Sequence, residues 1–228
     1  GKSTLKNCAI EPEVMDLINF LNKCGALIKV KNRTITVRGV EGLKLQDYKV
    51  IPDRIEAGSY ILATMATKGR LKLNNFNPKD LALPLKLYKG MGLKIKKLSN
   101  SSYEIYCKTL KPIKKISTKE FPGYPTDLQA QLIATQLKSG LKSKVVENIF
   151  ENRFIHIPEL RRFGANLSIK GKTVTIDKTS NLLGAEVMAT DIRASFSLII
   201  AAMMSKGKTV INRIYHLDRG YEDFDLKL

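Results

Sequence analysis

A pattern that recurs about every 70 residues constrains the fold of this chain more than any other feature. Each copy opens with a glycine and an extended segment, passes an asparagine, and continues into a helix that ends at a second glycine. The opening glycines lie 68, 71 and 67 residues apart, at Gly1, Gly69, Gly140 and Gly207, and the asparagines are Asn7, Asn75, Asn148 and Asn212. The spacing predicts one supersecondary unit repeated along the chain.

The second glycine keeps the same step. Gly25, Gly92 and Gly164 lie 24, 23 and 24 residues after their openers, where a helix C-cap is expected. Each is followed by alternating segments typical of strands, such as residues 26–30 and 34–37. The fourth copy stops before its second glycine. Because the chain begins and ends within a repeat, we expect it to be a fragment of a longer protein.

Three further helices are predicted between the copies, at residues 56–67, 127–137 and 191–204. Each is entered through an aspartate, Asp53, Asp127 or Asp191, which predicts three equivalent helix N-termini. The third helix is almost entirely apolar and should be buried. These features indicate an α/β fold of repeated strand and helix units, with helices inside and sheets outside.

Residues 121–131 place a carboxylate at one of these N-termini. Prolines and a glycine force a turn, Thr126 is predicted to cap the following helix, and Gln129 stands at the capping-box position. Asp127 would point outward in the first turn, where the helix dipole favours its negative charge. By itself this stretch favours an aspartate that only complements the helix dipole.

The net charge of +18 raises the odds of polyanion binding. However, the lysines are scattered and lack the interleaved aromatic residues of single-strand binders. Three cysteines (Cys8, Cys24 and Cys107) and two histidines predict neither a disulfide framework nor a metal site. Apolar runs are too short to cross a bilayer, and no signal-peptide pattern is present. We therefore expect a cytoplasmic protein with no metal, no cofactor and no membrane partner.

Four stretches combine unusual residues more densely than packing requires, at residues 121–131, 150–160, 188–195 and 215–222. Together with residues 7–13 and 51–58, they resemble the UDP-N-acetylglucosamine enolpyruvyl transferases (1-carboxyvinyltransferases) of peptidoglycan synthesis. The resemblance implies an inside-out α/β barrel fold with two domains and a cleft between them. Residues 1–50 would be the last repeat of the domain that carries the catalytic cysteine loop. Residues 51–228 would be the second domain, with its third repeat cut short.

The resemblance also implies the reaction, transfer of the enolpyruvyl group of phosphoenolpyruvate to the sugar 3-hydroxyl, and a role in cell wall biogenesis, cell shape and cell division. Asp127 matches the aspartate that contacts this hydroxyl and would accept its proton. Arg219 matches an arginine that meets phosphoenolpyruvate, with an ion pair to Asp218 as the structural alternative. The family's reactive cysteine loop, its N-terminal lysine and asparagine and its partner arginines have no counterpart here.

The remaining site residues each have a structural alternative. Ile149, Phe150 and Glu151 match a segment that contacts the sugar nucleotide, although a turn packed on the core is the alternative. Arg153 and Arg193 match arginines near the cleft, and salt bridges to Asp191 or Glu151 are at least as plausible as substrate contact. His156 lies in an apolar alternation, which favours a hydrogen-bonded core histidine.

Three hypotheses remain open from the sequence. The first is the C-terminal portion of a peptidoglycan enolpyruvyl transferase, whose partner is the missing N-terminal half and which is inactive alone. The second is a basic nucleic-acid-binding module of related fold, which the scattered lysines disfavour. The third is a split-gene half with a binding role only. Steep salt dependence would distinguish the nucleic-acid binder.

Overall fold

The computed structural model describes residues 1–227 and divides the chain into two compact units. The first unit is Gly1–Pro52 with Glu120–Pro122, and the second comprises Asp53–Lys119 and the chain from Gly123 onward. That residues 1–50 are the last repeat of a larger domain stays a prediction.

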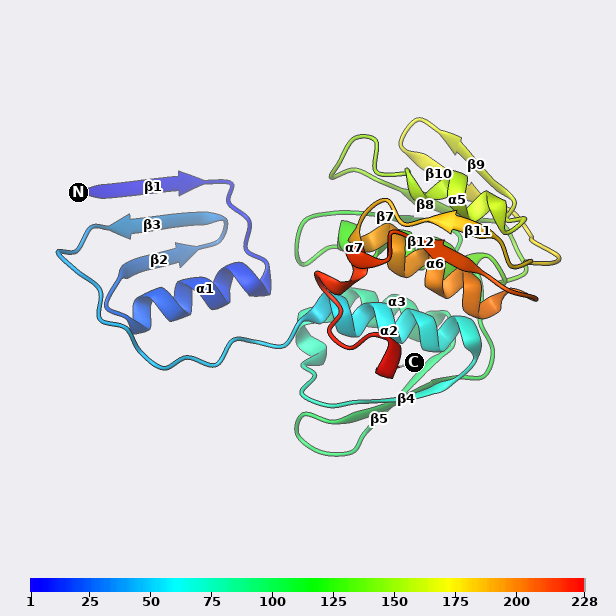
Figure 1. The fold of residues 1–228 in the computed structure, drawn as a ribbon. Helices are drawn as coiled ribbons and strands as arrows, with labels where there is room; N and C mark the ends of the chain where they lie inside the picture. Colours follow the sequence, from blue (N-terminus) through cyan, green and yellow to red (C-terminus); the bar gives the residue numbers. More distant parts are fainter. Residues whose placement is uncertain (228) are drawn as a thin grey trace. The chain divides into compact units, whose positions relative to one another are not determined.

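The first unit is one helix packed on a three-stranded antiparallel sheet of order β1-β3-β2 (Figure 1). Its elements are β1 (Lys2–Lys6), α1 (Pro12–Lys23), β2 (Leu27–Lys31) and β3 (Thr34–Arg38). The segment after β3 returns to the helix, where the Tyr48 hydroxyl donates a 2.8 Å hydrogen bond to Asp16 Oδ1. This bond raises the pKa of the Tyr48 phenol.

The second unit contains the other three-quarters of the chain. Its helices are α2 (Arg54–Thr67), α3 (Ala82–Gly90), α4 (Gln129–Gln136), α5 (His156–Arg162), α6 (Ile192–Met204) and α7 (Tyr215–Asp218), with 3-10 turns η1 (Pro78–Leu81), η2 (Thr126–Leu128) and η3 (Asp225–Lys227). Its strands are β4 (Arg70–Leu73), β5 (Leu93–Lys97), β6 (Tyr103–Cys107), β7 (Ile116–Ser117), β8 (Ser143–Val146), β9 (Leu167–Lys170), β10 (Thr173–Ile176), β11 (Glu186–Met188) and β12 (Val210–Asn212).

Three helices form the core of the second unit. All of α4 and most of α2 and α6 are buried, and the three helices pack against one another. Sheets of order β4-β6-β5, β7-β8-β10-β9 and β11-β12 lie around them. Figure 1 shows α2 and α6 between the sheet that contains β4 and β5 and the sheet that contains β8 to β10. The predicted α/β arrangement, with helices inside and sheets outside, is confirmed.

A buried polar contact joins these central helices to the C-terminal segment. The hydroxyls of Ser59 on α2 and Tyr221 share a 2.8 Å hydrogen bond, and Gln131 Nε2 on α4 donates to Ser59 Oγ at 3.0 Å. Burial raises the pKa of the Tyr221 phenol. Because buried polar groups are costly unless they are paired, this contact fixes the residues after α7 on the helical core.

The repeat predicted from the glycines is present in the backbone. Gly25, Gly92 and Gly164 follow α1, α3 and α5 with φ of 103°, 113° and 85°, a left-handed conformation that glycine adopts without a side-chain clash. The recurring asparagines do not share one backbone conformation. Asn7 and Asn75 are left-handed, whereas in the later copies Asn152 and Arg213 have this conformation and Asn148 and Asn212 do not.

Candidate active site

The three predicted helix N-termini are not equivalent. Asp53 caps α2, because its Oδ1 accepts from the amides of Ile55 and Glu56 at 2.6 and 3.1 Å. Asp191 caps α6 in the same way through Arg193 and Ala194, at 2.7 and 2.8 Å. Asp127 caps nothing, since it lies inside the 3-10 turn η2 that precedes α4. Its carboxylate is therefore available to side chains.

The predicted capping box of Thr126 and Gln129 is wrong. The 3-10 turn moves the start of α4 to Gln129, and neither η2 nor α4 has a side-chain cap. The Thr126 hydroxyl instead donates a 2.8 Å hydrogen bond to Glu147 Oε2. Gln129 is buried. A tertiary partner has replaced the local one.

Two arginines from distant segments hold the Asp127 carboxylate. Arg153 Nη2 donates to Oδ1 at 2.8 Å, and Arg193 Nη2, in the first turn of α6, donates to Oδ2 at 3.4 Å. The side chain of Asp127 keeps 36% of its surface exposed, against 26% for Arg153 and 19% for Arg193. An ionised carboxylate offers about four lone-pair positions, so Asp127 can still accept a hydrogen bond from a hydroxyl.

The salt-bridge partners predicted for Arg153 and Arg193 are therefore wrong. Asp191 is occupied as the cap of α6, and the Glu151 side chain is exposed. Both guanidinium groups meet Asp127 instead. The sequence named Asp127, Arg153 and Arg193 as candidate site residues, and the structure places these three side chains in contact, with Asp127 as the shared carboxylate.

The loop from Glu147 to Arg153 is held in place by hydrogen bonds to the buried carboxylate of Glu147. Glu147 is 1% exposed, and its Oε1 accepts from the amides of Ile149 and Phe150 at 2.8 and 3.2 Å. The Arg153 guanidinium lies 4.7 Å from the ring centroid of Phe150, a cation–π contact that steadies the arginine. Sequence reasoning missed Glu147, whose only signal is an acid that directly follows the two valines at the end of β8.

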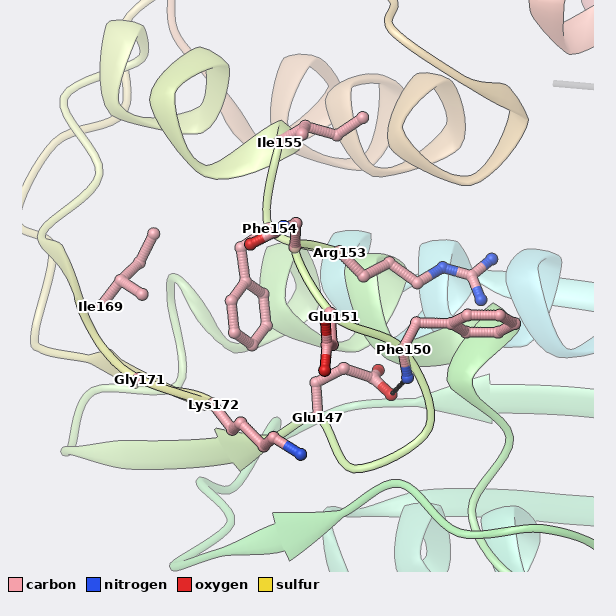
Figure 2. A pocket seen from close by; sticks show the side chains of 10 residues that line it. Glu147, Phe150, Glu151, Arg153, Phe154, Ile155, Ile169, Gly171 and Lys172 are labelled. Atoms are coloured by element: carbon pink, nitrogen blue, oxygen red, sulfur yellow. Dashed lines mark hydrogen bonds between the residues drawn. The ribbon is translucent and has the colours of Figure 1, made fainter.

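A pocket of about 500 Å³ lies between this loop and the β9–β10 hairpin. It is lined by Glu147, Phe150, Glu151, Asn152, Arg153, Phe154, Ile155, Ile169, Gly171 and Lys172. Figure 2 shows Arg153 and Phe150 extending to one side of the loop, while Phe154 lies toward Ile169. The lining of the pocket combines apolar side chains with a few charged groups, as small-molecule sites commonly do. Phe150 and Glu151 line it as candidate contacts, whereas Ile149 does not.

Arg219 is not part of this cluster. It is exposed at the C-terminal end of α7, and within residues 1–227 no ion pair joins it to Asp127 or to Asp218. A side chain on neighbouring Gly220 would collide with Ile192 on α6. The glycine therefore permits close packing of α7 on α6, while the Arg219 side chain remains exposed.

His156 is a core residue, as predicted, but it is not fully hydrogen-bonded. It is 2% exposed at the start of α5, and its Nε2 has no partner among the described residues. Burial lowers its pKa from 6.5 to about 4; nearby Asp191 opposes this shift and Arg153 adds to it. The imidazole is therefore neutral at pH 7.

Other features of residues 1–227 bear on the predicted ligands. No group of three or more His, Cys, Asp or Glu side chains lies close enough to hold a metal ion within this range. The three cysteines are free. Among the described helices, none combines the length and apolar character that a bilayer crossing requires.

Comparison with known proteins supports the resemblance. The sequence matches the family EPSP synthase (3-phosphoshikimate 1-carboxyvinyltransferase) over residues 1–228. It is 50% identical to a UDP-N-acetylglucosamine 1-carboxyvinyltransferase of Pelagibacter ubique (strain HTCC1062) and 45% identical to one of Koribacter versatilis (strain Ellin345). All of this chain is covered in both alignments, but only 55% and 53% of the relatives. The chain thus spans about half the length of the curated relatives it matches.

Solved structures agree in fold. The enolpyruvyl transferase NikO from Streptomyces tendae superimposes with a TM-score of 0.88 at 26% identity, covering 100% of this chain and 55% of NikO. An EPSP synthase from Acinetobacter baumannii superimposes with a TM-score of 0.71 at 16% identity, covering 98% of this chain and 55% of that enzyme. With the family match along its whole length, the chain belongs to the EPSP synthase (3-phosphoshikimate 1-carboxyvinyltransferase) family, among relatives named UDP-N-acetylglucosamine 1-carboxyvinyltransferase.

Proposed function

We propose that this chain supplies one wall of the active site of a UDP-N-acetylglucosamine 1-carboxyvinyltransferase. The observation that carries the proposal is the Asp127 carboxylate, which is partly exposed between Arg153 and Arg193. Arg153 also lines the pocket, whose walls combine apolar and charged side chains. The relatives' names support the acceptor. In this proposal the product serves peptidoglycan synthesis in the cytoplasm, and with it cell shape and division.

The reaction adds the sugar 3-hydroxyl to phosphoenolpyruvate and then eliminates phosphate. In the first step the hydroxyl oxygen bonds to C2 of phosphoenolpyruvate while C3 gains a proton. In the second step C3 loses a proton and the C2–O bond to phosphate breaks. Asp127 takes the hydroxyl proton, which a carboxylate can do when it lies within hydrogen-bonding distance. Its two guanidinium partners leave the group with a net positive charge, which favours the anionic substrates.

The other site residues receive roles consistent with their positions. Arg219, exposed on α7, binds an oxyanion of phosphoenolpyruvate, because a guanidinium grips two oxygens at once. Phe150 and Glu151 meet the sugar nucleotide at the pocket, and the Ile149 segment contributes its backbone edge. The remaining cations and the reactive cysteine come from the N-terminal half that the relatives possess.

The proposal is tested by comparing two acceptor substrates, UDP-N-acetylglucosamine and 3-phosphoshikimate. This chain is joined to the N-terminal half of the P. ubique relative, and phosphate release from phosphoenolpyruvate is followed with UDP-N-acetylglucosamine or with 3-phosphoshikimate. We expect enzyme-proportional release with the sugar nucleotide alone. Release with 3-phosphoshikimate instead, or with neither acceptor from a folded fusion, would refute the assigned substrate.

A further inference from the structure

We infer that Glu147 is a positioning residue, which holds the Asp127 turn and the Arg153 loop at a fixed spacing. The inference rests on the proposed function for the roles of Asp127 and Arg153. Glu147 touches neither the proposed substrates nor the reacting atoms. It would act through its hydrogen bonds to the segments that do.

The carboxylate of Glu147 is buried without a cation. It is 1% exposed, and no salt bridge reaches it within residues 1–227. Four neutral donors satisfy it instead, namely the hydroxyls of Thr118 and Thr126 at 2.8 Å and the amides of Ile149 and Phe150. Burying a charge is costly unless it is fully hydrogen-bonded, so this arrangement fixes its donors as firmly as it fixes Glu147.

The two oxygens of Glu147 face different parts of the site. Oε1 holds the loop through the Ile149 and Phe150 amides, and Oε2 holds the Asp127 turn through Thr126. Thr126 Oγ1 also accepts from Arg153 Nη1 at 3.2 Å. Glu147, Thr126, Arg153 and Asp127 are therefore linked in sequence by hydrogen bonds, and any shift of Glu147 reaches the arginine.

The isosteric substitution Glu147→Gln distinguishes a positioning role through hydrogen bonds from a role in packing alone. In Glu147→Gln the amide nitrogen must replace one oxygen. If it replaces Oε2, it donates to Thr126, whose hydroxyl must then rotate its own hydrogen away and accept from both the new amide and Arg153. If it replaces Oε1, it faces the amides of Ile149 and Phe150, donor against donor. Both orientations disturb the link, although the side chain keeps its size.

Gln136 provides a matched control. It is also buried, and its Oε1 likewise accepts from backbone and hydroxyl donors, here the amide of Ile113 and the hydroxyl of Ser143, both at 2.9 Å. It lies at the far end of α4 and makes no hydrogen bond to a site residue. Gln136→Met should therefore destabilise the protein without affecting Arg153.

The test follows the Arg153 guanidinium by ¹⁵N NMR in the full 228-residue chain, with the signal assigned from Arg153→Lys. In the parent, rotation about the Nε–Cζ bond should be slow, because both terminal nitrogens are bound. Loss of a hydrogen bond to a charged group should accelerate it about tenfold or more in Glu147→Gln. Thr126→Val should do the same, and Thr126→Ser, which keeps the hydroxyl, should restore the parental rate.

Unchanged rotation in Glu147→Gln, or equal acceleration in Gln136→Met, would overturn the inference. If Glu147→Gln does not fold, the comparison of Thr126→Val with Thr126→Ser replaces it. Unchanged rotation of the Arg153 guanidinium in Thr126→Val would equally overturn the inference. UDP-N-acetylglucosamine is titrated into the same samples. A parent that does not respond to it counts against the proposed function and leaves the Arg153 measurement valid.

Discussion

At the scale of single residues, Asp127 combines an ion-pair role with the proposed proton transfer. Asp127→Asn keeps the shape and removes the base, so phosphate release by the completed enzyme should fall about a hundredfold to ten-thousandfold. Stability should change little, because partly exposed ion pairs contribute roughly 0–1 kcal/mol each. Phosphate release and thermal unfolding measure the two effects. Parental turnover would remove Asp127 from the role of base.

His156 makes stability depend on pH. Its pKa is about 4 in the folded chain and near 6.5 when unfolded, so the unfolded state binds more protons between these values. Stability should therefore fall as pH drops from 6.5 toward 4, by roughly 3 kcal/mol from this group. His156→Phe should flatten this slope in denaturant titrations across the same pH range. A variant that retains the whole parental slope would show that other groups cause it.

At the scale of elements, the turn that carries Asp127 is seated on α2 through a glycine. A Cβ at Gly58 would lie 2.6 Å from Leu128 Cδ1, and Leu128 is fully buried beside Asp127. Gly58→Ala should therefore cost about 1–3 kcal/mol through overpacking, partly offset by the better helix propensity of alanine. Gly90→Ala, which would meet nothing within 4 Å at the end of α3, should be neutral or stabilising. Thermal unfolding of both variants checks this, and equal melting temperatures would contradict the packing argument.

The same element shows what the sequence could predict. Capping glycines located α1, α3 and α5, and entry aspartates with apolar residues located α2, α4 and α6, because these signals are local. Asp127, Arg153 and Arg193 were named as candidates through the family resemblance of their motifs, and their mutual contact was not predicted. The partner of Thr126 could not be predicted, because a local cap and the distant Glu147 compete for one hydroxyl. Glu147 itself has donors in three separate segments, and no spacing in the chain reveals them.

At the scale of the whole molecule, the chain as given should not turn over its substrates. The side chains of the Asp127 cluster retain 19–36% of their surface exposed, and the chain spans about half the length of its relatives. Positioning and preorganised electrostatics supply most of an enzyme's acceleration, and both require a site that excludes water. Purified chain, phosphoenolpyruvate and UDP-N-acetylglucosamine should therefore release no phosphate above the uncatalysed background. Weak binding of the sugar nucleotide is expected from the same sample.

Adding the N-terminal half of the P. ubique relative as a separate chain should restore phosphate release in proportion to the limiting half. Enzyme-proportional release by this chain alone would instead show that the N-terminal half is dispensable.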